Sequence, residues 1–123
     1  MRKIKVLVVS PPALAQLIKH LFHERPEFEV LGSLETLKHL ARYSGRRPDL
    51  IVASVKPMTI GVCPAVVSIK KSSPVSKVVL ICPIRDFIRG ALKCGADACL
   101  EQEKLVFHLL ATARSLSNGS RGN

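Results

Sequence analysis

Short runs of β-branched and other apolar residues alternate along the chain with stretches in which apolar residues recur at helical spacing. The apolar runs lie at 4–9, 50–55 and 77–82, and two shorter ones lie at 28–31 and 97–100. Continuous apolar runs of this length are typical of strands that are buried on both faces of a sheet. We therefore predict five strands at these positions.

Helical patterns separate the strands. In the first, at 13–24, Pro12 suits the first turn, Pro26 ends the helix, and the apolar face is Leu14, Leu17, Ile18, Leu21 and Phe22. Further helices are predicted at 33–43, where Ser33 is a suitable N-cap, and at 63–71, 84–93 and 103–116. Strands that alternate with helices predict an α/β protein, a doubly wound parallel sheet with helices on both faces. We expect Val6, Val8, Ile51, Val79 and Ile81 to be buried in it.

The length of 123 residues favours one domain, which we expect to span 1–116. The polar, glycine-rich residues 117–123 are predicted to be a flexible tail or the start of a linker. No apolar stretch approaches the roughly 18 to 20 residues that cross a bilayer, so we expect no membrane association. The basic first residues lead into no long apolar segment, so we expect no signal peptide and a cytoplasmic protein.

The chain is strongly basic. Nineteen Lys and Arg against nine Asp and Glu give a formal charge of +10, which favours an anionic partner such as nucleic acid, phospholipid or an acidic protein. The basic residues are scattered, however, and aromatic residues are too few for a platform on which bases stack. We therefore favour the interpretation that the charge keeps the chain soluble.

The four cysteines, Cys63, Cys82, Cys94 and Cys99, lack the two-residue gap of a zinc or thioredoxin-like motif. We expect reduced thiols. Cys82 and Cys99 fall in strands that should be neighbours, which raises the hypothesis of a thiol switch. We expect different registers and favour buried, inert thiols, because a disulfide needs Cα atoms within roughly 7 Å.

Other catalytic or metal-binding patterns are weak. His20 and His23 are three residues apart on one predicted helix and could share a face, but ordinary surface histidines explain them. The sequence has no Ser/His/Asp spacing, no glycine-rich phosphate loop and no paired catalytic carboxylates. We therefore predict no enzymatic activity, no metal and no cofactor.

Three segments carry a family resemblance: KIKVLVVSPPALAQLIKHLFHERPEFEVLG, RRPDLIVASVKPM and ALKCGADACLEQEKL. They resemble the receiver domain of bacterial two-component response regulators (CheY-like), above all receivers that precede a helix-turn-helix in transcription regulators. The resemblance covers about residues 3–116, and PDLI and GADACL are its most specific parts. It implies a flavodoxin-like (βα)5 fold with strand order 2-1-3-4-5 and a role in two-component signal transduction.

The family's chemical positions hold other residue types here. By resemblance, the acidic pair after the first strand corresponds to Ser10 and Pro11, the phospho-accepting Asp to Ser54, the Thr or Ser after the fourth strand to Cys82, the Lys after the fifth to Gln102, and the switch aromatic to Cys99.

These replacements remove the means of phosphorylation. Mg²⁺ needs carboxylate ligands, whereas Ser10 and Ser54 offer only neutral hydroxyls. Gln102 supplies no positive charge to a phosphoryl oxygen, and Cys82 is a poor hydrogen-bond donor. We predict a degenerate pocket in a pseudo-receiver that lacks the phospho-acceptor Asp.

Such a domain is expected to act through protein interaction, independently of phosphorylation. By resemblance, the docking or dimer face of the fourth helix, fifth strand and fifth helix contains Arg85, Arg89, Lys93, Lys104, Phe107, His108, Ala111 and Arg114. Its basic character favours an acidic protein partner, and DNA only through an attached domain or non-specific basic charge. By resemblance, the same face is also a place where a homodimer would form. Two alternatives stay open: a phosphorelay receiver with non-standard chemistry at Ser54, and direct nucleic-acid binding through the basic charge.

Overall fold

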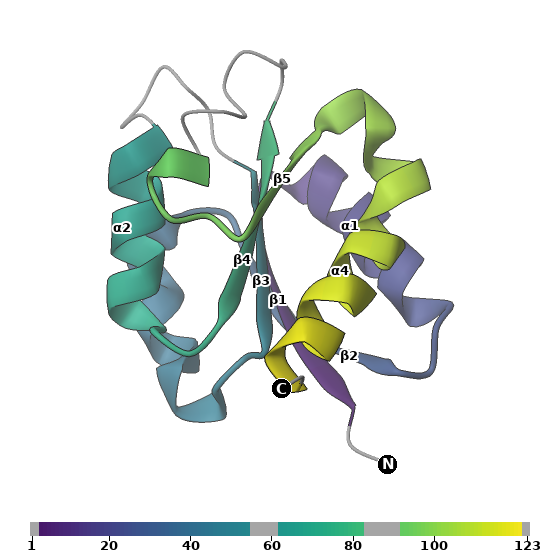
Figure 1. The fold of residues 1–123 in the computed structure, drawn as a ribbon, viewed down its shortest axis with the longest axis horizontal. Coiled ribbons are helices and arrows are strands. Elements are labelled where there is room, and N and C mark those ends of the chain that lie inside the picture. Colours follow the sequence, from purple (N-terminus) through teal and green to yellow (C-terminus); the bar gives the residue numbers. More distant parts are fainter. Residues whose placement is uncertain (1–2, 55–61, 83–91, 122–123) are drawn as a thin grey trace.

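A single parallel sheet forms the centre of the molecule (Figure 1). The computed structural model describes residues 3–54, 62–82 and 92–121. The strands are β1 (Ile4–Val9), β2 (Phe28–Leu34), β3 (Leu50–Ser54), β4 (Lys77–Cys82) and β5 (Ala98–Glu101). Every neighbouring pair is parallel, and the spatial order is β2-β1-β3-β4-β5. The predicted α/β fold and strand order are confirmed.

Helices cover both faces of the sheet (Figure 1). On one face lie α1 (Pro12–His23) and α4 (Leu105–Arg121), and on the other lie α2 (Val62–Ser72) and the 3-10 helix η1 (Leu37–Arg46). Side chains alternate between these layers, as a strand requires. In β1, Val6 and Val8 pack toward α1 and α4, and the intervening Leu7 packs toward α2. All five residues predicted to be buried are inaccessible to solvent: Val6, Val8, Ile51, Val79 and Ile81.

The region after β2 differs from the prediction. No α-helix begins at Ser33, because the second strand continues to Leu34 and pairs with the second half of β1 after a register shift between Val6 and Leu7. The remaining residues form η1 instead, so strand pairing overrides a local helical pattern. Tyr43 of η1 lies against Gly32, where an added Cβ would come within 2.6 Å of the Tyr43 hydroxyl oxygen.

The last helix is longer than predicted. The 3-10 helix η3 (Gln102–Lys104) leads into α4, which runs to Arg121 and so includes most of the segment that was expected to be a flexible tail. The helix predicted at 84–93 lies outside the described residues except for its last two positions, which are helical. Within the described part of the chain, no helix is long and apolar enough to cross a membrane.

Two aspartates anchor the amino-terminal end of the sheet. Asp49 precedes β3, and its carboxylate accepts a hydrogen bond of 2.9 Å from the backbone N–H of Lys5. Asp97 precedes β5, and its carboxylate accepts a bond of 2.8 Å from the backbone N–H of Val78 and pairs with Lys70 Nζ at 2.7 Å. Both aspartates therefore join the start of one strand to its neighbour.

Buried hydroxyls complete this end of the molecule. The Ser76 hydroxyl donates to the carbonyl oxygen of Pro48, and it lies 2.6 Å from the Ser73 hydroxyl oxygen. Both serines are buried in the turn between α2 and β4. At the same end, Arg114 Nε of α4 bonds Glu27 Oε2 at 2.8 Å, just before β2.

Candidate functional site

The residues predicted to form a degenerate pocket follow the carboxyl ends of the strands. Ser54 ends β3 and Cys82 ends β4, and they come from adjacent strands in which Ser54 is paired with Ile81. Ser10 follows β1, and Gln102 follows β5. Because the strands are parallel, all four positions lie at one edge of the sheet, where ligands bind in doubly wound folds.

Ser10 and Pro11 form the connection from β1 to the start of α1. Ser10 is buried, and its backbone N–H donates to the carbonyl oxygen of Leu34 at 2.8 Å. Its hydroxyl donates to the carbonyl oxygen of Pro11 at 3.1 Å, and Pro11 is the N-cap of α1. The serine at the position of the family's acidic pair thus has a structural role.

This donor set does not fit Mg²⁺. The positions at 10, 11, 54 and 102 supply two hydroxyls, a proline and an amide, whereas Mg²⁺ is held through carboxylates. Glu101 ends β5 at the same edge, and its carboxylate lies 3.5 Å from Lys104 Nζ. Among the described residues, no three His, Cys, Asp or Glu side chains gather into a metal-binding group.

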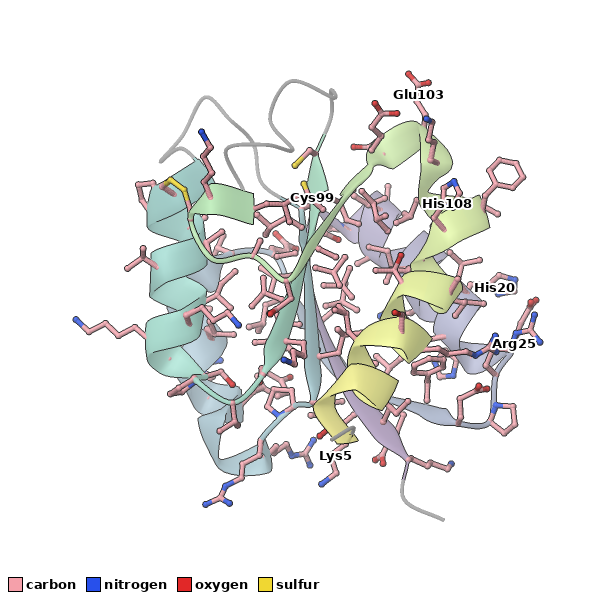
Figure 2. All side chains as sticks on the ribbon, viewed as in Figure 1. Lys5, His20, Arg25, Cys99, Glu103 and His108 are labelled. Carbon is pink, nitrogen blue, oxygen red and sulfur yellow. A yellow bond between two sulfur atoms is a disulfide. The ribbon has the colours of Figure 1, made fainter. Side chains whose placement is uncertain are left out.

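Cys82 and Cys99 are free thiols, as expected, but they meet at this edge, whereas their different registers were expected to keep them apart. Cys99 is paired with Leu80, so the registers do differ, by the two residues from Leu80 to Cys82. Both side chains nevertheless project to the α2 side of the sheet, and their sulfur atoms are 2.7 Å apart. Figure 2 shows Cys99 at the upper part of the sheet. An offset of two residues keeps both side chains on one face, because side chains alternate along a strand.

The shared hydrogen bond shifts the pKa values of the two thiols in opposite directions. The hydrogen bond from Cys99 lowers the pKa of Cys82 below its ordinary value of 9.0, against the opposing effect of burial. The same bond, with burial, raises the pKa of Cys99. The hydrogen bond from Cys99 therefore favours the thiolate form of Cys82.

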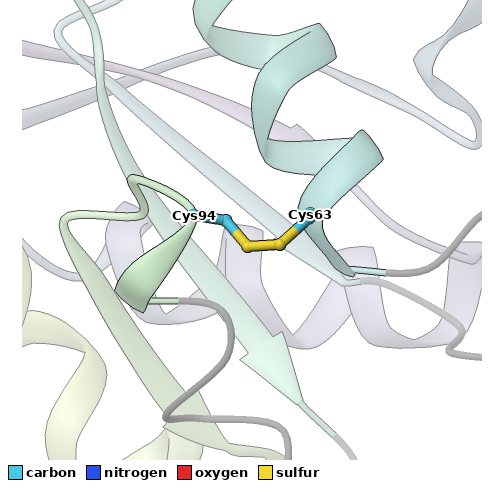
Figure 3. The surroundings of a disulfide bond; sticks show 2 residues. All are labelled: Cys63 and Cys94. Carbon is cyan, nitrogen blue, oxygen red and sulfur yellow. A yellow bond between two sulfur atoms is a disulfide. The ribbon is translucent and has the colours of Figure 1, made fainter.

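A second cysteine pair is joined by a disulfide, contrary to the expectation of reduced thiols throughout the chain. Cys63 in the first turn of α2 is bonded to Cys94, and their Cα atoms are 5.2 Å apart (Figure 3). The two cysteines are 31 residues apart in sequence. No local motif marks them, because only the packing of α2 beside the segment that enters β5 brings them together.

The predicted interaction face is in part exposed. Lys93, Lys104, Phe107, His108 and Ala111 are all exposed, and Phe107 is 79% exposed. Figure 2 shows His108 on the outer side of α4. Arg114 differs from the others because it is held in the ion pair with Glu27. Arg85 and Arg89 lie outside the described residues.

Solved structures with the same fold include receiver domains of response regulators. The response regulator domain of Thermotoga maritima CheB has a TM-score of 0.79 at 19% identity, with 95% of this chain and 98% of that chain covered. The receiver domain of a putative response regulator NarL from Mycobacterium tuberculosis has a TM-score of 0.79 at 13% identity, with both chains fully covered. RcsB from Salmonella typhimurium has a TM-score of 0.84 at 13% identity, with 97% of this chain and 62% of that chain covered.

These likenesses establish the fold. Their identities are all low, and no protein-family model or curated protein sequence matches the chain. The chain therefore has the fold of a response-regulator receiver domain, and its residues at the carboxyl edge must be judged by their own chemistry.

Proposed function

We propose that this protein is a receiver-like signalling domain of a two-component system that acts by binding another protein, without being phosphorylated and without enzymatic activity. One observation carries the proposal: the described residues form the five-stranded sheet of a receiver fold, while the edge at which a receiver would hold Mg²⁺ presents the neutral residues Ser10, Pro11, Ser54 and Gln102. Phosphoryl transfer needs compensation of the charge that builds on the transferred group, and these residues supply none.

The proposed binding surface is the outward side of α4. Val106 and Phe107 are adjacent on it and are 52% and 79% exposed. Lys104 and His108 flank them and are also exposed. An exposed aromatic residue among basic and apolar neighbours suits a protein partner. The formal charge of +10 favours an acidic partner, whereas a second copy would have to meet this surface through its apolar residues against the repulsion of like charges.

Incubation with acetyl phosphate and Mg²⁺ tests the absence of phosphorylation. We expect the intact mass of the protein to stay unchanged while the CheB receiver domain, as a positive control, gains a phosphoryl group. Ser54→Asp should also stay unmodified, because Ser10, Pro11 and Gln102 still lack the other charges. A stable phosphoryl adduct mapped to Ser54 would instead support the alternative of a receiver with non-standard chemistry.

Substitution on α4 tests the binding surface. Phe107→Ser should weaken self-association in sedimentation equilibrium, or weaken capture of a partner from the cells of origin. Val75→Ser is a matched control, because Val75 is 76% exposed and lies at the opposite end of the sheet, in the turn before β4. Equal binding by both variants would place the interaction elsewhere.

Nucleic-acid binding is a second candidate, supported by the formal charge of +10. Its signature is a steep fall of affinity with salt, because each phosphate contact releases counterions. A gel shift that persists at physiological salt and declines steeply above it would favour this candidate over an acidic protein partner.

Trapping thiols in intact cells would test the proposed cytoplasmic location, where a disulfide such as Cys63–Cys94 is uncommon.

A further inference from the structure

The two free cysteines, Cys82 and Cys99, form a chemically distinctive group at the carboxyl edge of the sheet. Their sulfur atoms are 2.7 Å apart, and a disulfide bond measures about 2.05 Å. The bond therefore requires the sulfur atoms to approach by less than about 1 Å. The two cysteines lie diagonally across the paired strands β4 and β5 on one face of the sheet, and this placement directs their side chains toward each other.

The surroundings of the pair combine shielding with access. Cys82 is 1% exposed and belongs to the apolar core beneath α2, whereas Cys99 packs against the same core and is partly exposed. A small oxidant can therefore reach the pair through Cys99, whereas the buried Cys82 is almost inaccessible to large molecules. The hydrogen bond between the thiols also lowers the pKa of Cys82, which favours the reactive thiolate form.

We propose that Cys82 and Cys99 are a site of reversible oxidation, at which a hydroperoxide converts the two thiols into an intramolecular disulfide. The pair loses one proton, and the resulting thiolate sulfur attacks a peroxide oxygen. An S–O bond forms, the O–O bond breaks, and the leaving oxygen takes up the proton to give water or an alcohol. The product is a sulfenic acid beside the remaining thiol.

The second thiol completes the reaction. Its sulfur attacks the sulfenic sulfur, the S–S bond forms, and the S–O bond breaks. The departing hydroxide combines with the proton of that thiol to give water. Two thiols are thus oxidised by two electrons and one hydroperoxide is reduced by two, so hydrogen peroxide yields two molecules of water. An external dithiol returns the pair to the reduced form by exchange.

The position of the proposed Cys82–Cys99 bond links it through the chain to an exposed surface of the protein. Cys99 lies in β5, which leads through η3 directly into α4 and its exposed Phe107. A covalent link between β4 and β5 acts at the base of that helix. This consequence rests on the proposed function, whereas the oxidation itself does not.

The unmodified protein provides the primary test. It is treated with one equivalent of hydrogen peroxide, its remaining thiols are blocked, and it is digested without reductant. We expect a linked pair of peptides that contains Cys82 and Cys99, the loss of both labelled thiols with no oxygen added, and full recovery with dithiothreitol. Thiols that stay free, sulfinic or sulfonic products without a cross-link, or disulfides exchanged with Cys63 or Cys94 would overturn the proposal.

Variants separate this pair from the existing disulfide. The double variant Cys63→Ser/Cys94→Ser should still form the Cys82–Cys99 bond, and circular dichroism verifies that it is folded. Cys99→Ser should instead leave Cys82 without an intramolecular partner and stop reversible oxidation within the molecule. Formation of the bond with no change in partner binding would overturn the surface consequence alone. A phosphoryl adduct would overturn the proposed function and leave the oxidation site standing.

Discussion

The two ends of the sheet are built on different chemistry. At the amino-terminal end, the carboxylates of Asp49 and Asp97 each accept a backbone hydrogen bond from a neighbouring strand, and Asp97 also pairs with Lys70. At the carboxyl-terminal end, β3 and β4 end in Ser54 and Cys82, which are small and uncharged, and β5 ends in Glu101, whose carboxylate lies 3.5 Å from Lys104 Nζ. Carboxylates thus bond neighbouring strands at the first end, whereas at the second end positions 10, 11 and 54, which correspond by resemblance to a receiver's acidic pair and phospho-acceptor, carry none.

This difference separates the structural part of the receiver pattern from its chemical part. The PDLI and GADACL segments contain Asp49 and Asp97, and both aspartates bond backbone atoms at the structural end. A sheet needs these bonds whether or not it is phosphorylated, because an unpaired buried N–H is costly. The resemblance in sequence therefore reports the fold, and the function has to be read from the other end.

The largest expected effect is at Asp97. Asp97→Ala should lower the free energy of unfolding by about 2 to 3 kcal/mol, since it leaves the N–H of Val78 without its acceptor and leaves the ammonium group of Lys70 with the carbonyl oxygen of Ser76 but no carboxylate. Asp97→Asn keeps an acceptor and should cost less. Urea unfolding followed by circular dichroism measures both, and equal losses would mean that the charge is irrelevant.

A smaller loss is expected at the buried hydroxyls of the same end. Ser76→Ala should cost about 1 to 2 kcal/mol, because the carbonyl oxygen of Pro48 and the hydroxyl of Ser73 each lose a partner in a buried turn. The midpoint of urea unfolding gives this value if the slope is unchanged. An unchanged free energy of unfolding would show that the two hydroxyls do not stabilise this end of the sheet.

Acid should weaken the amino-terminal end through Glu27. The hydrogen bond from Arg114 lowers the pKa of Glu27 below its ordinary value of 4.5. A lowered pKa in the folded state gives stability that is present above the ordinary value and is lost as the pH falls through the folded value. The difference in unfolding free energy between the protein and Arg114→Gln should be small at neutral pH and should vanish in acid. A difference that grows in acid would contradict the assignment.

The smallest effect is expected at the carboxyl-terminal end. Ser54→Ala should change the free energy of unfolding by no more than about 0.5 kcal/mol, although it is the same chemical change as Ser76→Ala. The two variants are measured side by side by urea unfolding. Equal losses in both would break the contrast between the ends.

Much of the fold was accessible to sequence reasoning. The buried runs of β1, β3 and β4 and the apolar face of α1 follow from local periodicity, and the five predicted core residues are all buried. The absence of carboxylates at positions 10, 11 and 54 could also be predicted from the sequence, because it depends only on which residue types end or follow the predicted strands.

Other features required the tertiary structure. The segment from Ser33 has a local helical pattern, yet β1 draws Ser33 and Leu34 into a strand, because backbone pairing along a neighbouring strand outweighs weak helix propensity. Arg114, predicted on an open face, is instead bonded to Glu27, which is 87 residues away in sequence.

The cysteines give the clearest division between the two kinds of information. The sequence by itself determined that Cys82 and Cys99 lie in strands expected to be adjacent, and that Cys63 and Cys94 belong to no spaced motif. Only the tertiary structure decided that the first pair meets sulfur to sulfur and that the second pair is bonded. The reason is that sulfur contacts depend on strand register and on helix packing, which are set by long-range pairing and not by the residues nearby in the chain.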